Sequence, residues 1–167
     1  MGVAAEAGAG TEEETLDFLQ SFLRYTQPKV IVEAGTCQGN FVAVAHMACP
    51  KAAIYTADIF EHKWICDVRG WAVFFAGDFE EMLKAWFTCP EIDFAFIDSG
   101  PPSMRLLPKR EPGVRLRHYN AVLPYMKKGG IIATHDTRKT DWTGASTIIE
   151  DAGMNLNSGR GLSLRQV

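Results

Sequence analysis

The chain has 167 residues, of which 47% are hydrophobic and 22% are charged, and its formal net charge is −3. This composition is typical of a globular protein of about one domain, and it excludes a disordered chain or a protein that coats nucleic acid. No run of about 18 apolar residues is available to span a membrane, so no membrane association is expected.

Residues 1–10 are small, and they lack the basic start and apolar stretch of a secretory signal, so we expect a flexible leader. A single domain is expected over residues 11–167. Thr11 and Glu14 match a capping box, and apolar residues at helical spacing then continue until Pro28 ends the predicted helix.

Apolar strands and helices alternate after this first helix. We expect strands at 29–34, 52–58, 71–77, 92–98 and 131–134, helices at 40–48, 79–87, 118–126 and 144–152, and an irregular or helical piece at 61–68. Continuously apolar strands with helices between them indicate a parallel sheet that is covered on both faces. The tail 154–167 predicts two short antiparallel strands. The sequence therefore predicts an α/β fold with a doubly wound, mostly parallel seven-stranded sheet and an antiparallel C-terminal edge.

A loop at 99–117 is the one long connection, and such loops are usually functional. Its basic residues are Arg105, Lys109, Arg110, Arg115 and Arg117. Because guanidinium groups pair well with carboxylate or phosphate, one interpretation is an anionic small-molecule partner. The alternative is a solvated basic loop that balances an acidic protein. Nucleic acid is not expected, because the charge is confined to one loop without exposed aromatic residues.

A glycine turn follows the first predicted strand, where Glu33 ends the apolar run and Gly35 and Gly39 let the backbone approach a ligand closely. Ligands of open parallel sheets bind beyond the carboxyl ends of the strands. Asp58 ends the next strand, where an acid can accept hydrogen bonds from both ribose hydroxyls of a nucleoside. NAD fits this pattern too, but the fingerprint G-x-G-x-x-G needs a third glycine, which is missing here. The simplest alternative is a turn that binds nothing.

Several motifs, taken in chain order, resemble the class I S-adenosylmethionine-dependent methyltransferases. They are E-A-G-T-x-x-G at 33–39, the strand-ending Asp58, G-D-F at 77–79, D-F-A-F-I-D at 93–98 and Y-N-A-V-L-P-Y-M-K-K-G-G-I-I-A-T-H-D-T at 119–137. The last motif is similar to the small-molecule O-methyltransferase branch, in which a G-G-strand-H-D element is typical. The resemblance covers nearly the whole chain, and it implies a Rossmann-like sheet.

The resemblance implies S-adenosyl-L-methionine as the cofactor. On this basis the cofactor-binding residues would be Glu33, Gly35, Thr36 and Gly39 at the amino-acid end, Asp58 at the ribose, and Asp78 and Phe79 near the adenine. Asp78 is explained equally well as the N-cap of the helix that follows it.

The same resemblance places Asp98, His135 and Asp136 together beside the transferable methyl group, as the catalytic residues. Enzymes of the catechol O-methyltransferase type bind Mg²⁺ at these strand ends, so the three residues are also candidate ligands of a divalent cation, with Mg²⁺ as the first choice. His135 stands where that type has an acid, and imidazole suits Fe²⁺, Mn²⁺ or Zn²⁺ better than Mg²⁺. Alternatively, His135 is the general base for the acceptor hydroxyl, or it is structural.

We therefore expect methyl transfer to a hydroxyl group of a small molecule. Two alternatives remain open: an NAD(P)-linked oxidoreductase, which would need a third glycine and a Tyr-x-x-x-Lys pair, and a non-catalytic nucleotide-binding domain. The loop 99–117, the N-terminal helix or a second subunit must close the pocket, so a homodimer is compatible with the sequence. The four cysteines form no C-x-x-C pair, which favours a reduced, cytoplasmic location.

Overall fold

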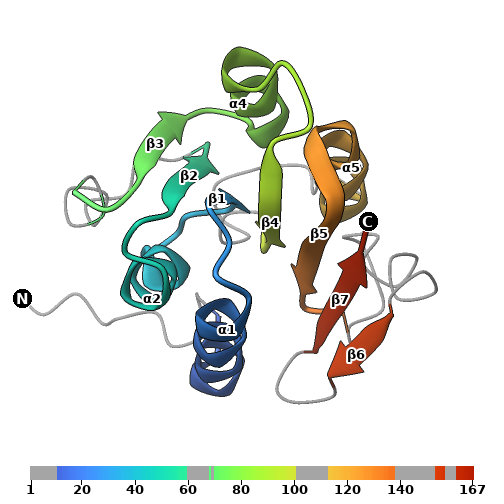
Figure 1. The fold of residues 1–167 in the computed structure, drawn as a ribbon. Helices are drawn as coiled ribbons and strands as arrows, with labels where there is room; N and C mark the ends of the chain where they lie inside the picture. Colours follow the sequence, from blue (N-terminus) through green and yellow to red (C-terminus); the bar gives the residue numbers. More distant parts are fainter. Residues whose placement is uncertain (1–10, 60–67, 69, 101–112, 138–152, 157–160) are drawn as a thin grey trace, which may run out of the picture.

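A computed structural model describes residues 11–59, 68, 70–100, 113–137, 153–156 and 161–167. These residues form one seven-stranded sheet with helices on both faces (Figure 1). The strands are β1 (Val30–Ala34), β2 (Ala53–Asp58), β3 (Val73–Ala76), β4 (Ile92–Ile97), β5 (Met126–His135), β6 (Met154–Leu156) and β7 (Leu162–Gln166).

The strand order across the sheet is β3-β2-β1-β4-β5-β7-β6. The first five strands in this order are parallel, whereas β7 is antiparallel to both β5 and β6. The predicted fold class is therefore confirmed, including the antiparallel C-terminal edge. The chain direction across the sheet reverses between β1 and β4, so their carboxyl ends lie at the switch point where open α/β sheets bind ligands.

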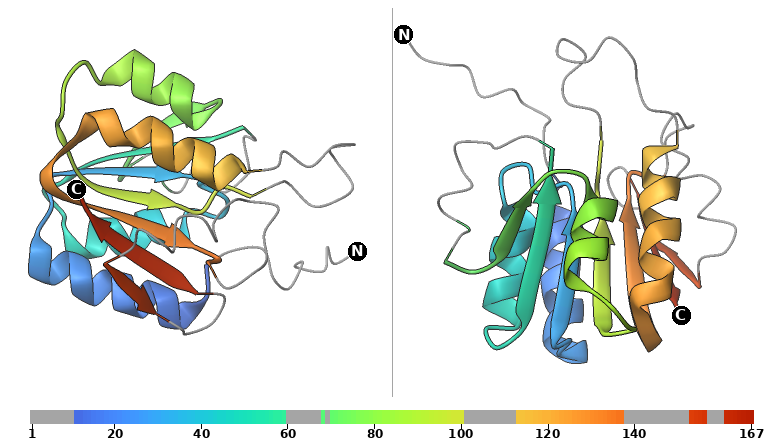
Figure 2. Two further views of the ribbon diagram at one scale, coloured as in Figure 1. Left: turned by 90° about the vertical axis from the view of Figure 1, so that its right-hand side faces the viewer. Right: turned by 90° about the horizontal axis from the view of Figure 1, so that it is seen from above.

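Helices of the described part of the chain cover both faces of the sheet, as the left view of Figure 2 shows. The helices α1 (Glu13–Thr26) and α2 (Asn40–Ala48) lie on one face, and α4 (Phe79–Trp86) and α5 (Val114–Val122) lie on the other. A short 3₁₀ helix, η1 (Leu123–Tyr125), connects α5 to β5. Within the described part of the chain, no helix combines the length and apolar character needed to cross a membrane.

The central strands are apolar on both faces because each face packs against its own pair of helices. Ile31 and Phe96 lie in the core cluster beneath α1 and α2, whereas Val32 and Ile97 lie in the cluster beneath α4 and α5. These four side chains are fully buried. Adjacent residues of one strand point to opposite faces of the sheet. Because helices cover both faces, residues that point to either face are buried, and the apolar pattern is continuous along the strand.

The first helix begins differently from its prediction. Its N-cap is Glu12, which makes no side-chain cap hydrogen bond, so the predicted capping box of Thr11 and Glu14 is wrong. The Thr11 hydroxyl instead donates to the carboxylate of Asp98, at 2.8 Å. A charged acceptor gives a stronger hydrogen bond than a backbone cap would, and it therefore determines where the Thr11 side chain points.

The fifth helix and fifth strand also begin earlier than predicted. Helix α5 begins at Val114 because Gly113 adopts a left-handed conformation (φ 74°), so the predicted loop ends several residues sooner. Strand β5 begins at Met126 and includes Gly129 and Gly130, which form backbone hydrogen bonds with Val167. The predicted helix at 144–152 and most of the predicted piece at 61–68 lie outside the described residues.

The buried face of α1 should dominate the stability of its contact with the sheet. We expect Leu23→Ala to lower the free energy of unfolding by about 2–5 kcal/mol, because Leu23 is fully buried beside α2 and the sheet. Tyr25→Ala on the same helix is the control, since Tyr25 is 89% exposed, and its effect should stay within about 0.5 kcal/mol. Urea unfolding of both variants tests this, and equal losses would contradict it.

Candidate functional site

The turn after β1 brings the carboxyl ends of β1 and β4 into close contact. Gly35 adopts φ 96°, and a Cβ atom at this position would lie 2.9 Å from the carbonyl oxygen of Asp98 and 3.1 Å from the Cα of Ser99. No side chain fits in that space, so glycine is required for both conformation and packing. Gly39 also has a positive φ and is the N-cap of α2. The two glycines thus shape a narrow strand-to-helix turn.

Glu33 is buried near the end of β1, where it is 2% exposed, and it is connected to Thr56 and Thr36 by a chain of hydrogen bonds. Its carboxylate accepts a hydrogen bond from the Thr56 hydroxyl at 2.5 Å, and Thr56 in turn lies 2.5 Å from the Thr36 hydroxyl. Burial raises the pKa of Glu33 to about 8; the hydrogen bond from Thr56 opposes this shift, and the charges of Asp98 and Asp58 add to it. The carboxyl group therefore gains stability from a cation, such as an ammonium group, placed beside it.

Asp58 ends β2 and fixes the glycine turn from the side. Its carboxylate accepts a hydrogen bond from the backbone N–H of Cys37 at 2.8 Å. Cys37 has a positive φ of 45°, which is uncommon for a residue with a side chain, so this hydrogen bond stabilises a strained turn. The acid predicted to bind the ribose thus also organises the backbone beside it.

A pocket lies between the turn and the end of β4. It is a small hollow that is partly open to solvent, and its lining residues are Thr11, Glu33, Gly35, Thr36, Cys37, Gln38, Asn40, Phe41 and Asp98. The buried acid Glu33 and the strand-end acid Asp98 therefore border the same hollow as the glycine turn.

Asp78 and Phe79 lie at the start of α4, on the other face of the sheet, and neither lines this pocket. Asp78 accepts a hydrogen bond from the backbone of Glu80, so its N-cap alternative is confirmed. Burial raises the pKa of Asp78, but hydrogen bonds from Arg117 and Glu80 outweigh it and lower that pKa to about 2. Phe79 is 2% exposed, and its ring packs against His118. The two residues nevertheless follow a strand end next to Asp58, since Gly77 donates its backbone N–H to the Asp58 carbonyl at 2.9 Å.

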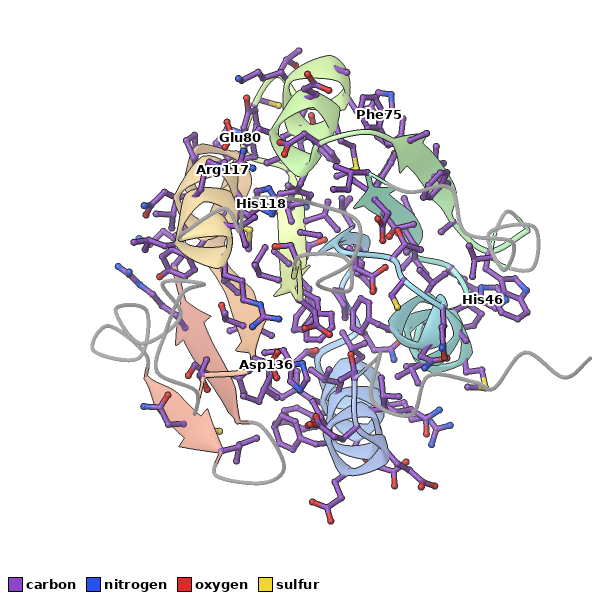
Figure 3. The ribbon with its side chains drawn as sticks, turned by 180° about the vertical axis from the view of Figure 1, so that it is seen from behind. His46, Phe75, Glu80, Arg117, His118 and Asp136 are labelled. Atoms are coloured by element: carbon purple, nitrogen blue, oxygen red, sulfur yellow. The ribbon has the colours of Figure 1, made fainter. Side chains whose placement is uncertain are left out.

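Asp98, His135 and Asp136 converge at the ends of β4 and β5, as their positions on neighbouring strands predict. The Nδ1 atom of His135 lies 2.9 Å from Asp98 and 3.9 Å from Asp136. Asp98 also lines the pocket beside Gly35, so this cluster is continuous with the glycine turn. Figure 3 shows Asp136 near the end of α1, well separated from the labelled residues of α4 and α5.

Three residues that the sequence did not place next to Asp98 or His135 complete the cluster. Glu12 contacts His135 Nε2 at 2.6 Å, and Thr11 donates to Asp98. The Nη2 atom of Arg115 donates to Asp98 at 3.0 Å and to Asp136 at 2.9 Å. Thr11 and Glu12 looked like a helix start and Arg115 like part of a basic loop, so no local pattern marked them. Arg115 is helical and only 3% exposed, which corrects the prediction of a loop residue.

The electrostatic surroundings shift the pKa values of His135 and Asp98 in opposite directions. Burial lowers the pKa of His135, but the hydrogen bond to Asp98 and the charges of the surrounding acids outweigh it, so that pKa lies above its usual value. Burial raises the pKa of Asp98, yet His135 and Arg115 together lower it. The imidazole ring therefore lies between two carboxylates, those of Asp98 and Glu12, in a fixed orientation.

The carboxylates of Asp98 and Asp136 fit a magnesium ion poorly in this arrangement, because Arg115 already bridges them. A divalent ion would be repelled by the guanidinium, and Arg115 would have to leave its contacts with both carboxylates before the ion could bind between them. The donor atoms that do converge within 4.8 Å belong to Glu12, His135 and Asp136. Such a mixed set suits a softer ion than Mg²⁺. Both ring nitrogens of His135 also contact carboxylates, so neither is directed toward a vacant position.

Comparisons with known proteins identify the fold and the family. Residues 32–137 match a family model described as a methyltransferase domain, which covers more than half of the chain. The chain is also similar in structure to the SAM-bound O-methyltransferase TomG from Streptomyces achromogenes, with TM-score 0.71, 14% identity, and coverage of 96% of this chain and 82% of that one. No curated protein matches the sequence.

Two further solved structures are similar over most of their length. The SAH-bound methyltransferase PaMTH1 from Podospora anserina has TM-score 0.70 and 16% identity, covering 95% of this chain and 80% of that one. The SAH complex of an O-methyltransferase from Bacillus cereus has TM-score 0.68 and 14% identity, covering 94% and 82%. At these identities the similarity establishes a shared fold.

The raised pKa of Glu33 predicts a stability that depends on pH. Its folded pKa of about 8 exceeds the unfolded value of 4.5, so between these values the folded state keeps a proton that the unfolded state has lost. The stability from this proton is fully present below pH 4.5 and is lost as the pH rises through about 8. Glu33→Gln removes that loss, so the variant should gain on the wild type by several kcal/mol at high pH, at about 1.4 kcal/mol per pH unit.

Urea unfolding of the ligand-free protein at about pH 5 and about pH 8.5 measures this change. Glu14→Gln is the control, because Glu14 is exposed on α1. A stability difference between Glu33→Gln and wild type that stays constant across this range would contradict the assignment.

Proposed function

Because this chain belongs to the methyltransferase domain family, we propose that it transfers the methyl group of S-adenosylmethionine to a hydroxyl oxygen of a small molecule. The observation that carries this proposal is the convergence of Asp98, His135 and Asp136 beside the pocket of the glycine turn. The SAM and SAH complexes of the similar O-methyltransferases support the choice of cofactor and of an oxygen acceptor.

The glycine turn would bind the amino-acid end of the cofactor. Gly35 permits close approach of the backbone, Thr36 and Gly39 shape the turn, and Glu33 offers a buried carboxyl group to the cofactor ammonium. An ammonium group beside Glu33 would favour its charged form and so offset the cost of its burial. When bound, S-adenosylmethionine supplies an activated methyl group, which leaves the protein to orient the acceptor, exclude water and accept a proton.

The remaining cofactor residues would act near the nucleoside. Asp58 would accept hydrogen bonds from the ribose hydroxyls while it holds the Cys37 backbone. Asp78 and Phe79 would border the adenine through the backbone at the start of α4, because the carboxylate of Asp78 caps that helix and the ring of Phe79 is buried. These assignments follow from the resemblance and from the places of the residues at the carboxyl ends of β2 and β3.

We assign the acceptor's proton to His135 Nε2. Only the neutral ring can accept this proton, and because the neighbouring acids raise the pKa of His135, the base should act at a higher pH than an ordinary histidine would. Asp98 orients the ring through Nδ1 at 2.9 Å, which is how a carboxylate fixes the tautomer of a catalytic histidine. Glu12 occupies the opposite side of the ring, and its side chain is 30% exposed, against 13% for Asp98. An acceptor hydroxyl that displaces the Glu12 carboxylate would therefore meet Nε2 at hydrogen-bonding distance.

The acceptor would be a small molecule rather than nucleic acid. The proposal that the acceptor is anionic depends on Arg105, Lys109 and Arg110, which lie outside the described residues. Arg115 and Arg117 do not support it, because they already pair with acids of the protein. The carboxylates that surround His135, those of Asp98, Glu12 and Asp136, would repel a negatively charged group, so the reacting end suits a neutral hydroxyl such as that of a phenol.

Parallel calorimetric titrations with S-adenosylmethionine, its demethylated product and NAD test the cofactor. We expect both sulfur nucleosides to bind and NAD not to bind, since the third glycine of the dinucleotide fingerprint is missing. Mass spectrometry of catechols, phenols and hydroxy acids incubated with S-adenosylmethionine then identifies the acceptor class. Binding of NAD in preference to S-adenosylmethionine would overturn the proposal.

Substitution of the base separates catalysis from binding. We expect His135→Gln to lower turnover by about 100-fold or more while cofactor affinity is retained, because the ring accepts the proton but does not hold the cofactor. His46→Gln is the matched control, since His46 lies on α2, where it stacks on Trp71 away from Asp136 (Figure 3). Unchanged turnover in the His135→Gln enzyme would exclude His135 as the base.

A further inference from the structure

The charge balance at the ends of β4 and β5 depends on a guanidinium group. One nitrogen, Nη2 of Arg115, lies 3.0 Å from Asp98 and 2.9 Å from Asp136, so it bridges the acids that end these neighbouring strands. A bridging cation between two strand-end carboxylates is the position that the catechol-type resemblance implies for a divalent ion. We propose that Arg115 replaces this ion, so that the protein transfers methyl groups without a metal.

The geometry indicates that the Arg115 guanidinium is a fixed, buried part of the site and not a mobile surface charge. The Arg115 side chain is 4% exposed, and those of Asp98 and Asp136 are 13% and 12% exposed. Arg115 is the second residue of α5, which packs on β4 and β5, and the left-handed Gly113 determines where this helix begins. An arginine held by a helix loses little conformational freedom when its planar guanidinium pairs with carboxylates.

The histidine also acts against a metal at this position. A ligating imidazole must present a lone pair to the ion, yet the two nitrogens of His135 lie 2.9 Å from Asp98 and 2.6 Å from Glu12. Ligation would require breaking one of these contacts and removing Arg115 from Asp136. Arg115 is therefore a positioning residue, which holds the carboxylates of Asp98 and Asp136 in place beside His135 and keeps other cations out.

The neighbouring Arg117 provides a matched comparison on the same helix. Its guanidinium pairs with Asp78 at 2.9 Å and with Glu80, so it too lies between two acids, but its side chain is 35% exposed. Figure 3 shows Arg117 and Glu80 together at the α4–α5 edge, away from Asp136. Removing Arg117 should therefore create no metal site near His135.

Binding of Mn²⁺, measured by electron paramagnetic resonance, tests the proposal without any need for turnover. We expect no Mn²⁺ binding by the wild type, Arg115→Lys or Arg117→Gln at up to about 1 mM ion, a level typical of weak sites. Arg115→Gln removes the cation that bridges Asp98 and Asp136, so its affinity for Mn²⁺ should rise by about tenfold or more over the wild type. Adding Asp136→Asn to Arg115→Gln should abolish the gain, which places the ion at this site.

Measurements of turnover give a second test, which rests on the proposed function. Wild-type turnover should be unaffected by a chelator, and Arg115→Gln should lose activity that Mn²⁺ partly restores. Mn²⁺ binding by the wild type at micromolar concentrations, or chelator-sensitive wild-type turnover, would overturn the proposal, and either result remains decisive if Arg115→Gln fails to fold. Folded Arg115→Gln without any gain in Mn²⁺ affinity would overturn it as well. If the binding results hold but no acceptor is methylated, the proposed function fails and the assignment of Arg115 stands.

Discussion

The site depends on one consequence of the parallel sheet, which is that acids ending different strands meet at a single edge. Glu33, Asp58, Asp98 and Asp136 stand at or directly beyond the carboxyl ends of β1, β2, β4 and β5. Carboxylates gathered at a partly buried edge repel one another unless cations or hydrogen-bond donors compensate for their charges. Arg115 provides this compensation for Asp98 and Asp136, and the backbone N–H of Cys37 contributes it for Asp58.

The carboxylates at this edge are not all stabilised equally. The surroundings of Glu33 differ from those of Asp98, and the difference suits two separate roles. Around Glu33 the compensation is incomplete, because a pKa of about 8 shows that the protein stabilises the neutral acid better than the carboxylate. Such a group favours a cationic ligand. Around Asp98 the compensation is nearly complete, since three donors hold the carboxylate and the histidine in fixed orientations. The surroundings of Glu33 are therefore suited to binding a charged cofactor, and those of Asp98 to aligning an acceptor.

Patterns along the chain predicted the features that depend on local sequence. Continuous apolar strands indicated a sheet covered on both faces, and Gly35 marked a turn in which a Cβ atom would clash with the backbone of Asp98 and Ser99. Contacts between distant segments could not be predicted in this way. Glu12 and His135 are separated by 123 residues and Thr11 and Asp98 by 87, so nothing near Thr11 or Glu12 in the sequence indicates their partners.

The measurement that tests this account most directly is a crystal structure of the protein grown with S-adenosylhomocysteine and Mn²⁺, with anomalous diffraction data for manganese. The account predicts the nucleoside along the turn between Glu33 and Asp58, and the guanidinium of Arg115 between Asp98 and Asp136, without an anomalous peak. A manganese ion between those two carboxylates with Arg115 displaced, or a nucleoside bound away from the glycine turn, would contradict it.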